Sequence, residues 1–116
     1  MAITAECKIA LGNSLRTARK CCGISQRKAA QAVGKTNASL SDIENGYNFP
    51  SDELLLDLIK LFKPSDEKRE AIFDLYAKAK GTPPLDILMF LKENPNIQMY
   101  LRQMMKENQE RLEENK

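Results

Sequence analysis

Residues 25–46, SQRKAAQAVGKTNASLSDIENG, predict two short helices that are joined by a tight turn. Gly34 stands at the joint, where the chain must reverse within about three residues, and glycine adopts the positive φ angle that such a bend needs. The inward positions on either side of the turn are small or apolar: Ala30, Val33, Leu40 and Ile43. Each helix therefore has a narrow buried face.

Hydroxyl side chains stand at the start of both predicted helices. Ser25 and Thr36 can each accept a hydrogen bond from the free amides of the first turn, as an N-cap residue does. The outward positions of the second helix are short and mostly polar: Asn37, Ala38, Ser39, Ser41 and Asp42. Such a surface fits a groove better than a core, so the stretch predicts a helix-turn-helix.

From about Leu11 to Phe62 the chain resembles the phage-repressor (XRE or Cro/CI) class of helix-turn-helix DNA-binding domains. The resemblance covers roughly half of the chain and rests on residues at fixed spacing: Leu15, Arg16, Arg19, Ile24, Ser25, Gln26, Ala30, Val33, Gly34, Ile43, Glu44, Asn45, Gly46 and Pro50. It implies an all-α, lambda-repressor-like domain of about five helices, here with one or two additional C-terminal helices. The alternative is a helical hairpin whose pattern serves packing alone.

The resemblance also implies roles for single residues. Arg19 and Glu44 stand where related domains carry a structural ion pair, although two solvated side chains are the alternative. The second motif helix, Thr36 to Asn45, is expected to enter the major groove of double-stranded DNA. Backbone amides near Ser25 and Asn45 are expected to bind phosphates. The residues expected to contact DNA are Ser25, Gln26, Arg27, Lys35, Thr36, Asn37, Ala38, Ser39, Asp42 and Asn45.

Charge is distributed unevenly along the chain, although the net charge of the 116 residues is only +2. Residues 1–50 hold seven Lys or Arg and three Asp or Glu, a net charge of +4. Residues 51–116 hold eleven Lys or Arg and thirteen Asp or Glu, a net charge of −2. The positive field therefore lies on the half that carries the motif, as attraction to phosphate requires.

The residue types argue against an enzyme. There is no histidine, which excludes histidine-based triads and histidine metal ligands, and there is no phosphate-binding glycine loop. Cys7, Cys21 and Cys22 lack the Cys-x-x-Cys spacing of a metal site, and we expect small buried or half-buried side chains there. No cofactor and no metal are expected. Without a signal sequence or a run of about twenty apolar residues, the protein is expected to be cytoplasmic and not in a membrane.

The helices around the motif can be placed from their capping residues and from apolar residues that recur along one face of a helix, which we call stripes. The first is expected to begin near Thr4 or at the latest at Leu11, with the stripe Leu11, Leu15, Ala18 and Cys22. Gly12 costs about 1 kcal/mol relative to alanine, so the turns before it are expected to fray or form a separate arm. A further helix is expected to start after Ser51, and its apolar stripe is Leu54, Leu55, Leu58, Ile59 and Phe62. Another is expected to start after Pro64, and its stripe is Ala71, Ile72, Leu75, Tyr76 and Ala79.

Residues 81–116 depart from the minimal domain, so we expect a DNA-binding domain over 1–80 and a C-terminal helical extension over 81–116. A short helix over Leu85 to Leu91 is expected to be buried on most sides, and a last helix to run from Asn96 to about Glu113. These helices either enlarge the core or form a homodimer interface, and we favour the interface. Its expected contact residues are Leu88, Phe90, Ile97, Leu101 and Met104.

These observations predict a sequence-specific DNA-binding transcriptional regulator, with a repressor favoured. The alternative is a DNA-binding antitoxin whose C-terminal helices bind a toxin partner. A third possibility is a helical interaction module that no longer binds DNA.

Overall fold

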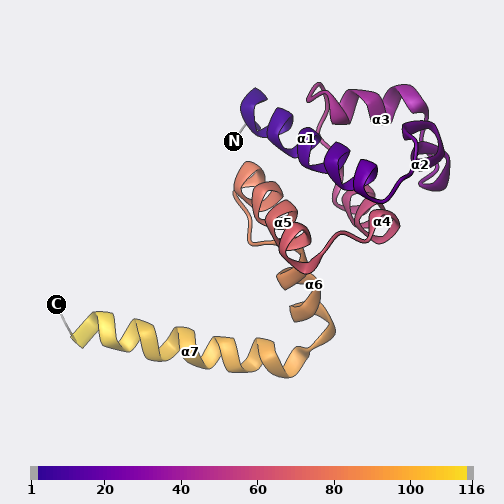
Figure 1. Ribbon diagram of the computed structural model, residues 1–116. Helices are drawn as coiled ribbons and strands as arrows, with labels where there is room; N and C mark the ends of the chain where they lie inside the picture. Colours follow the sequence, from indigo (N-terminus) through magenta and orange to yellow (C-terminus); the bar gives the residue numbers. More distant parts are fainter. Residues whose placement is uncertain (1–2, 115–116) are drawn as a thin grey trace. The chain divides into compact units, whose positions relative to one another are not determined.

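The computed structural model describes residues 3–114, and over this range it is all-helical, as predicted (Figure 1). The chain divides into two compact units, Met1–Leu85 and Asp86–Lys116, which we call the N-terminal unit and the C-terminal unit. The helices are α1 (Ala5–Cys21), α2 (Gln26–Ala32), α3 (Asn37–Glu44), α4 (Asp52–Phe62), α5 (Asp66–Lys80), α6 (Leu85–Glu93) and α7 (Pro95–Glu114).

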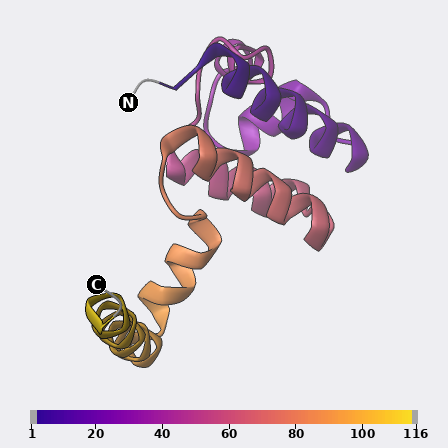
Figure 2. The same cartoon turned by 90° about the vertical axis from the view of Figure 1, so that its left-hand side faces the viewer.

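Helix α1 is the element on which the N-terminal unit is assembled, because it contacts α3, α4 and α5 (Figures 1 and 2). Thr4 caps it by accepting a hydrogen bond from the amide of Cys7, at 3.2 Å. Helix α2 packs against α3 and α4. Five leucine side chains of the core are almost completely buried and come from three helices: Leu11, Leu15, Leu40, Leu55 and Leu58.

The first turns of α1 pack against the motif, so the expectation that they would fray or form a separate arm is wrong. Gly12 is buried where α1 crosses the end of α3, and a Cβ there would collide with the carbonyl oxygens of Ile43 and Glu44. Gly46, at a φ of +81°, is covered by Ile9 of α1 in the same way. Glycine permits this close crossing of α1 over the end of α3 because it has no Cβ. Helix propensity, on which the expectation of fraying was based, does not take contacts between helices into account.

Two predicted stripes differ from the observed buried faces at some positions. Cys22 caps the end of α1 and is exposed, as is Cys21, and only Cys7 is half-buried as expected. In α5, Ala71 is exposed, and Phe73 is buried beside Ile72. The stripes of α1 and α5 were therefore correct in most positions and wrong at these.

The loop after α3 is fixed to the core by Tyr76 of α5. Phe49 stacks on the Tyr76 ring, with the centroids 4.8 Å apart and the planes 11° apart. The Tyr76 hydroxyl lies 2.9 Å from the carbonyl oxygen of Pro50 and 2.7 Å from Oδ1 of Asp52, to which Lys80 also donates at 2.8 Å. Burial, and then the hydrogen bond with Asp52, raise the pKa of Tyr76, and the hydrogen bonds from Lys80 and Tyr76 lower the pKa of Asp52.

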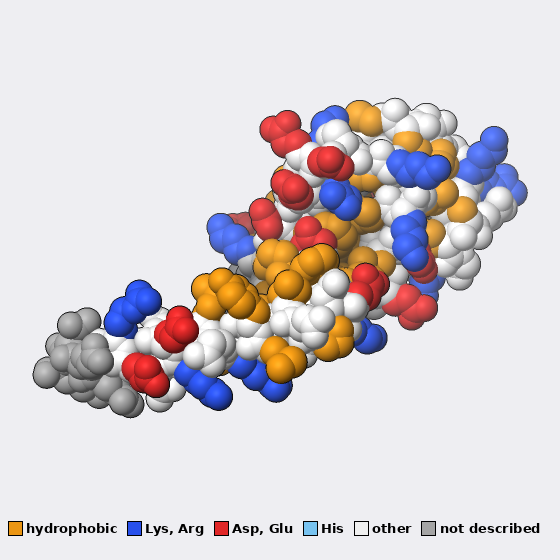
Figure 3. Space-filling model, turned by 90° about the horizontal axis from the view of Figure 1, so that it is seen from below, with side chains coloured by type: hydrophobic (Ala, Val, Ile, Leu, Met, Phe, Trp, Pro, Cys, Tyr) orange, Lys and Arg blue, Asp and Glu red, His pale blue; other side chains and the backbone are white. Residues whose placement is uncertain are grey.

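The C-terminal unit has no core of its own. Every residue from 86 to 111 is at least partly exposed, so the expectation that the short helix over Leu85–Leu91 would be buried on most sides is wrong. Figure 3 shows hydrophobic side chains at the surface of this unit beside charged ones. Ten large hydrophobic side chains of the unit are exposed: Ile87, Leu88, Met89, Phe90, Ile97, Met99, Tyr100, Leu101, Met104 and Met105. Within the described residues, none of the helices is long and apolar enough to cross a membrane.

Candidate nucleic-acid interface

The two motif helices begin at the predicted caps. Ser25 Oγ accepts from the amide of Lys28 at 3.2 Å, and Thr36 Oγ1 accepts from the amide of Ser39 at 3.0 Å. Gly34 turns the chain between them with a φ of +70°. These three local predictions are confirmed, because each depends only on residues next to one another in sequence.

Small side chains bring α2 close to α3. Ala29 and Ala30 are completely buried, and the amide of Lys35 donates to the carbonyl of Ala30 at 2.9 Å, which closes the turn. On α3, Leu40 and Ile43 face the core. The opposite side of α3 is therefore presented to solvent at a fixed angle.

The carboxylate of Glu44 at the end of α3 is 1% exposed and forms a bidentate ion pair with Arg19 of α1. Arg19 Nε lies 2.8 Å from Oε2 and Nη2 lies 3.0 Å from Oε1. Arg19 Nη1 also donates to the carbonyl of Ile24 at 3.0 Å, which holds the segment before α2. The expected ion pair is thus present, and it is deeply buried.

Two further side chains donate to the same carboxylate. Arg16 Nε lies 3.4 Å and Gln26 Nε2 lies 3.3 Å from Oε1 of Glu44. Arg16 was not assigned to this ion pair from the sequence, although it stands one helical turn before Arg19. Gln26 was expected to contact DNA, and its amide nitrogen is directed at Glu44. The ends of α1, α2 and α3 are therefore joined at one buried carboxylate.

The solvent face of α3 is made of short side chains. Asn37 and Ala38 are exposed, and Ser39, Ser41 and Asp42 are half-buried. At about 100° per residue, Ala38 and Asp42 lie on the side of the helix opposite Leu40 and Ile43, with Asn37 and Ser39 at its edges. No long side chain separates this face from a partner surface.

Basic side chains flank this face. Arg27 and Lys28 lie in the first turn of α2, Lys35 lies in the turn before α3, and all three are exposed. Ser25 and Thr36, which cap the two helices, are exposed beside them. Helix starts present amides and a partial positive charge, so both polar groups and cations are available here for an anion.

Backbone hydrogen bonds close the turn after α3. The amide of Asn45 donates to the carbonyl of Ser41 at 2.9 Å, and the amides of Tyr47 and Asn48 donate to the carbonyl of Asp42 at 2.8 and 3.2 Å. These amides are bonded within the turn, and the expectation that amides near Asn45 bind phosphate stays a prediction. The Asn45 side chain accepts from Arg16 and donates to Ser41 Oγ. Sequence reasoning also omitted Tyr47, which is 72% exposed directly after this turn.

Comparison with known proteins agrees with this geometry. Residues 15–67 match the family model described as helix-turn-helix. This segment is a helix-turn-helix domain. The match covers α2, α3 and α4 with the C-terminal part of α1, and it confirms the prediction of an XRE-type DNA-binding domain, the kind used in transcription regulation.

One solved structure shares the fold over most of the chain. It is the clp gene regulator ClgR from Corynebacterium glutamicum, with a TM-score of 0.51 and 23% sequence identity. The alignment covers 81% of this chain and 92% of that chain. At this identity the likeness shows the fold alone. No curated protein matches the sequence.

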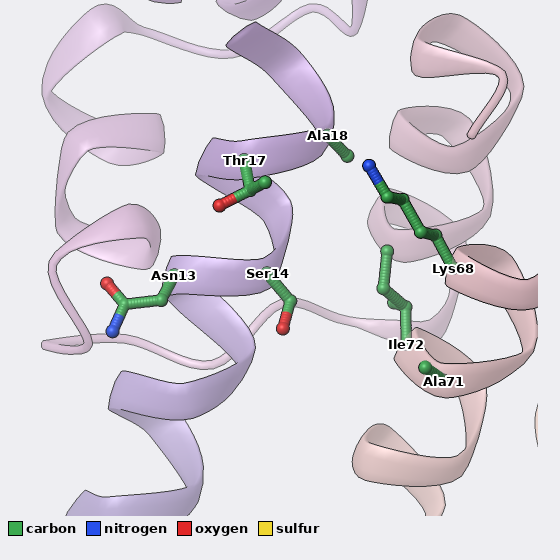
Figure 4. Close-up of a pocket in the computed structure, with 7 residues that line it drawn as sticks. All are labelled: Asn13, Ser14, Thr17, Ala18, Lys68, Ala71 and Ile72. Atoms are coloured by element: carbon green, nitrogen blue, oxygen red, sulfur yellow. The ribbon is translucent and has the colours of Figure 1, made fainter. Parts of the chain in front are cut away.

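A shallow hollow between α1 and α5 lies apart from the α3 face (Figure 4). Its volume is about 270 Å³, and its lining residues are Asn13, Ser14, Thr17, Ala18, Lys68, Ala71 and Ile72. Figure 4 shows Lys68 and Ile72 facing Ser14 and Ala18 across it, while Asn13 points away. Lys68 is the only titratable side chain among these lining residues.

Proposed function

We propose that the protein is a sequence-specific transcriptional repressor that binds an operator by inserting α3 into the major groove of duplex DNA. The observation that carries this proposal is the buried Glu44 network, which fixes a solvent face of short polar side chains on α3. Base recognition needs side chains held in one orientation, and a helix of this width fits the major groove. We propose that it acts by binding alone, in the cytoplasm and without a cofactor.

Two residues of α3 are suited to base recognition. Asn37 is exposed at the start of the helix, where its amide can bond N6 and N7 of adenine. Asp42 is half-buried on the outward side, where its carboxylate can accept from N4 of cytosine. Ala38 and Ser39 are short enough to let the helix axis approach the bases.

The flanking residues are suited to the phosphate backbone. Arg27 and Lys35 are exposed cations at the starts of α2 and α3, and the hydroxyl groups of Ser25 and Thr36 stand beside them. Gln26 acts mainly through Glu44, because its amide nitrogen is already 3.3 Å from that carboxylate. Asn45 likewise supports α3 through Arg16 and Ser41.

Repression follows from binding in the simplest way. A protein that occupies the major groove at a promoter excludes other proteins from the same base pairs, and it needs no additional activity to do so. We therefore propose repression in preference to activation.

Selection of bound sites from random duplex DNA tests this proposal. We expect enrichment of one defined sequence, with a binding constant that falls steeply as salt rises, by a log–log slope of about 0.9 for each phosphate neutralised. Failure to enrich any sequence, together with no binding at low salt, would rule the proposal out.

A further inference from the structure

Two adjacent thiols and two lysines line one hollow of the N-terminal unit, which we call the thiol hollow. Cys21 is the last residue of α1 and Cys22 caps the helix, and both are exposed free thiols. The hollow has a volume of about 190 Å³, and its lining residues are Ala18, Cys21, Cys22, Phe62, Lys63, Pro64, Ser65 and Lys68. Among these lining residues, all of which the structure describes, none is acidic. Nucleophilic and cationic side chains therefore meet at a place that the proposed function does not use.

The side chain of Lys68 on α5 reaches the sulfur of Cys21. Lys68 Nζ donates to Cys21 Sγ at 3.8 Å, and Figure 4 shows the Lys68 side chain extending toward Ala18 near the end of α1. Adjacent side chains point about 100° apart around a helix, so this contact distinguishes Cys21 from Cys22. Reactive cysteines are exposed and lie in electropositive surroundings. Cys21 meets both conditions, whereas Cys7 is half-buried.

The three thiols are not placed to bond one another. The Cα atoms of adjacent residues lie about 3.8 Å apart, below the range of about 4.4–6.8 Å that is usual for disulfides. Cys7 lies near the other end of the same helix, and at about 1.5 Å per residue it is roughly 21 Å from Cys21. Within the described residues, groups of three or more acidic, cysteine or histidine side chains that could hold a metal are absent. Cys21 is therefore suited to react with a small molecule from solution.

We propose that Cys21 is a site of covalent modification by small electrophiles of the α,β-unsaturated carbonyl class, such as quinones and enals. The sulfur forms a bond to the β carbon, the electron pair of the carbon–carbon double bond moves to the carbonyl oxygen, and Lys68 donates a hydrogen bond to that oxygen. The thiol proton leaves to solvent, and solvent returns a proton to the α carbon. The S–H bond has then been added across the double bond, and neither an oxidant nor a leaving group takes part.

The surroundings of Cys21 fit a ligand with an apolar body and a carbonyl group. The thiol hollow has the volume of about six water molecules at roughly 30 Å³ each, which is enough for one small ring. Phe62 and Pro64 supply apolar surface to this ring, and the two lysines supply donors to its carbonyl oxygen. Ala18 and Lys68 also line the hollow of about 270 Å³ between α1 and α5, so a substituent on the ring has further apolar surface to cover.

Two single-cysteine proteins compare the adjacent thiols. Cys7→Ser with Cys22→Ser keeps Cys21, and Cys7→Ser with Cys21→Ser keeps Cys22. Each full-length protein is treated with N-ethylmaleimide, an α,β-unsaturated carbonyl compound, or with iodoacetamide, and mass spectrometry follows the adduct over time. Iodoacetamide reacts by displacement of iodide and builds no charge on its carbonyl oxygen, so its rate reports the exposure and general reactivity of each thiol.

We expect the ratio of the maleimide rate to the iodoacetamide rate to be at least about tenfold higher for Cys21 than for Cys22, because a hydrogen bond to a charged group is worth about that factor. Equal ratios overturn the inference, whatever the absolute rates. Neither Cys21 nor Lys68 is among the residues proposed to contact DNA, and no DNA is present in the measurement. The result therefore stands apart from the success or failure of the proposed function.

Substitutions of Lys68 test the donor in the protein that keeps Cys21 alone. Methionine resembles lysine in helix propensity but has no donor, so we expect Lys68→Met to lower the ratio to that of Cys22. Lys68→Arg should keep most of the ratio, because arginine also donates. Lys78→Met removes another exposed lysine of α5 and serves as the matched control, with an unchanged ratio. A ratio that Lys68→Met leaves unchanged, or that Lys78→Met lowers equally, overturns the inference.

Discussion

Glu44 is the residue on which the orientation of α3, the helix that we propose faces DNA, depends. Its carboxylate is buried and accepts from Arg16, Arg19 and Gln26, which come from the two helices preceding α3. A carboxylate taken out of water needs such partners, and the partners need it. The network therefore couples the position of α3 to both α1 and α2.

We predict that Glu44→Gln lowers the free energy of unfolding by about 3–5 kcal/mol, because it leaves Arg19 buried without a counter-charge. Urea unfolding followed by circular dichroism measures this loss. Glu70→Gln is the matched control, since Glu70 is exposed on α5 and its replacement should change stability by no more than about 0.5 kcal/mol. Equal small effects of both changes would show that the network contributes little.

The raised pKa of Tyr76 makes the free energy of unfolding depend on pH. Its pKa is raised above the ordinary value of 10.0 by burial and by Asp52, so the folded state keeps the proton after the unfolded state has lost it. Its contribution to stability is complete below pH 10 and declines above it. At neutral pH the free energy of unfolding of the wild type should exceed that of Tyr76→Phe by about 1–3 kcal/mol, because the substitution leaves the carbonyl of Pro50 without its hydrogen-bond donor. Urea unfolding of both proteins should show this difference shrinking above pH 10, and a difference that does not shrink would contradict the raised pKa.

Asn37 should contribute to sequence discrimination. Replacing it by alanine removes a donor and an acceptor from the exposed start of α3, so binding to the selected site should weaken by about 1–3 kcal/mol while binding to unrelated DNA stays the same. Competition binding with the two duplexes measures the ratio. Asn13→Ala, an exposed change on α1, serves as the control. Equal weakening on both duplexes would show that Asn37 does not read bases.

At the scale of the elements, the crossing of α1 over the end of α3 positions the motif. Gly12 makes the crossing possible, because the carbonyl oxygens of Ile43 and Glu44 occupy the space that a Cβ would need. Tyr76 and Phe49 fix the loop on the other side of α3. Helix α3 is thus held at its C-terminal end from two directions.

Gly12→Ala should therefore destabilise the protein, although alanine is the better helix former by about 1 kcal/mol. Overpacking against backbone costs about 1–3 kcal/mol, and the displaced end of α3 carries Glu44. Thermal unfolding should show a lower midpoint for this variant and an unchanged or slightly higher midpoint for Asn13→Ala next to it, because alanine is also a better helix former than asparagine. A more stable Gly12→Ala protein would mean that α1 and α3 lie farther apart than described.

Local sequence signals were enough to predict the caps and the turn of the motif, but not the crossing of α1 over the end of α3. Ser25, Thr36 and Gly34 could be predicted because a cap or a turn depends on neighbouring residues. The pair of Arg19 with Glu44 was suggested by the family resemblance, whereas the role of Arg16 and the closeness of Gly12 to α3 depend on how distant helices cross. The composition of α6 predicted burial, but apolar composition does not specify which surface buries a helix.

At the scale of the whole molecule, the N-terminal unit carries the surface that we propose binds DNA, and the C-terminal unit exposes apolar side chains. The helix-turn-helix domain explains the first, since its match covers residues 15–67. We propose that α3 faces DNA, because repression by occupation of an operator requires it.

The most direct measurement of that claim compares two exposed alanines. Ala38 lies at the centre of the outward face of α3, and Ala71 lies on the surface of α5. Both can take a glutamate with little effect on stability. In fluorescence anisotropy with the selected duplex, we predict that Ala38→Glu weakens binding by about 100-fold, because its charge meets phosphates and base acceptors, whereas Ala71→Glu binds like the wild type. Wild-type affinity of Ala38→Glu would show that α3 does not face DNA.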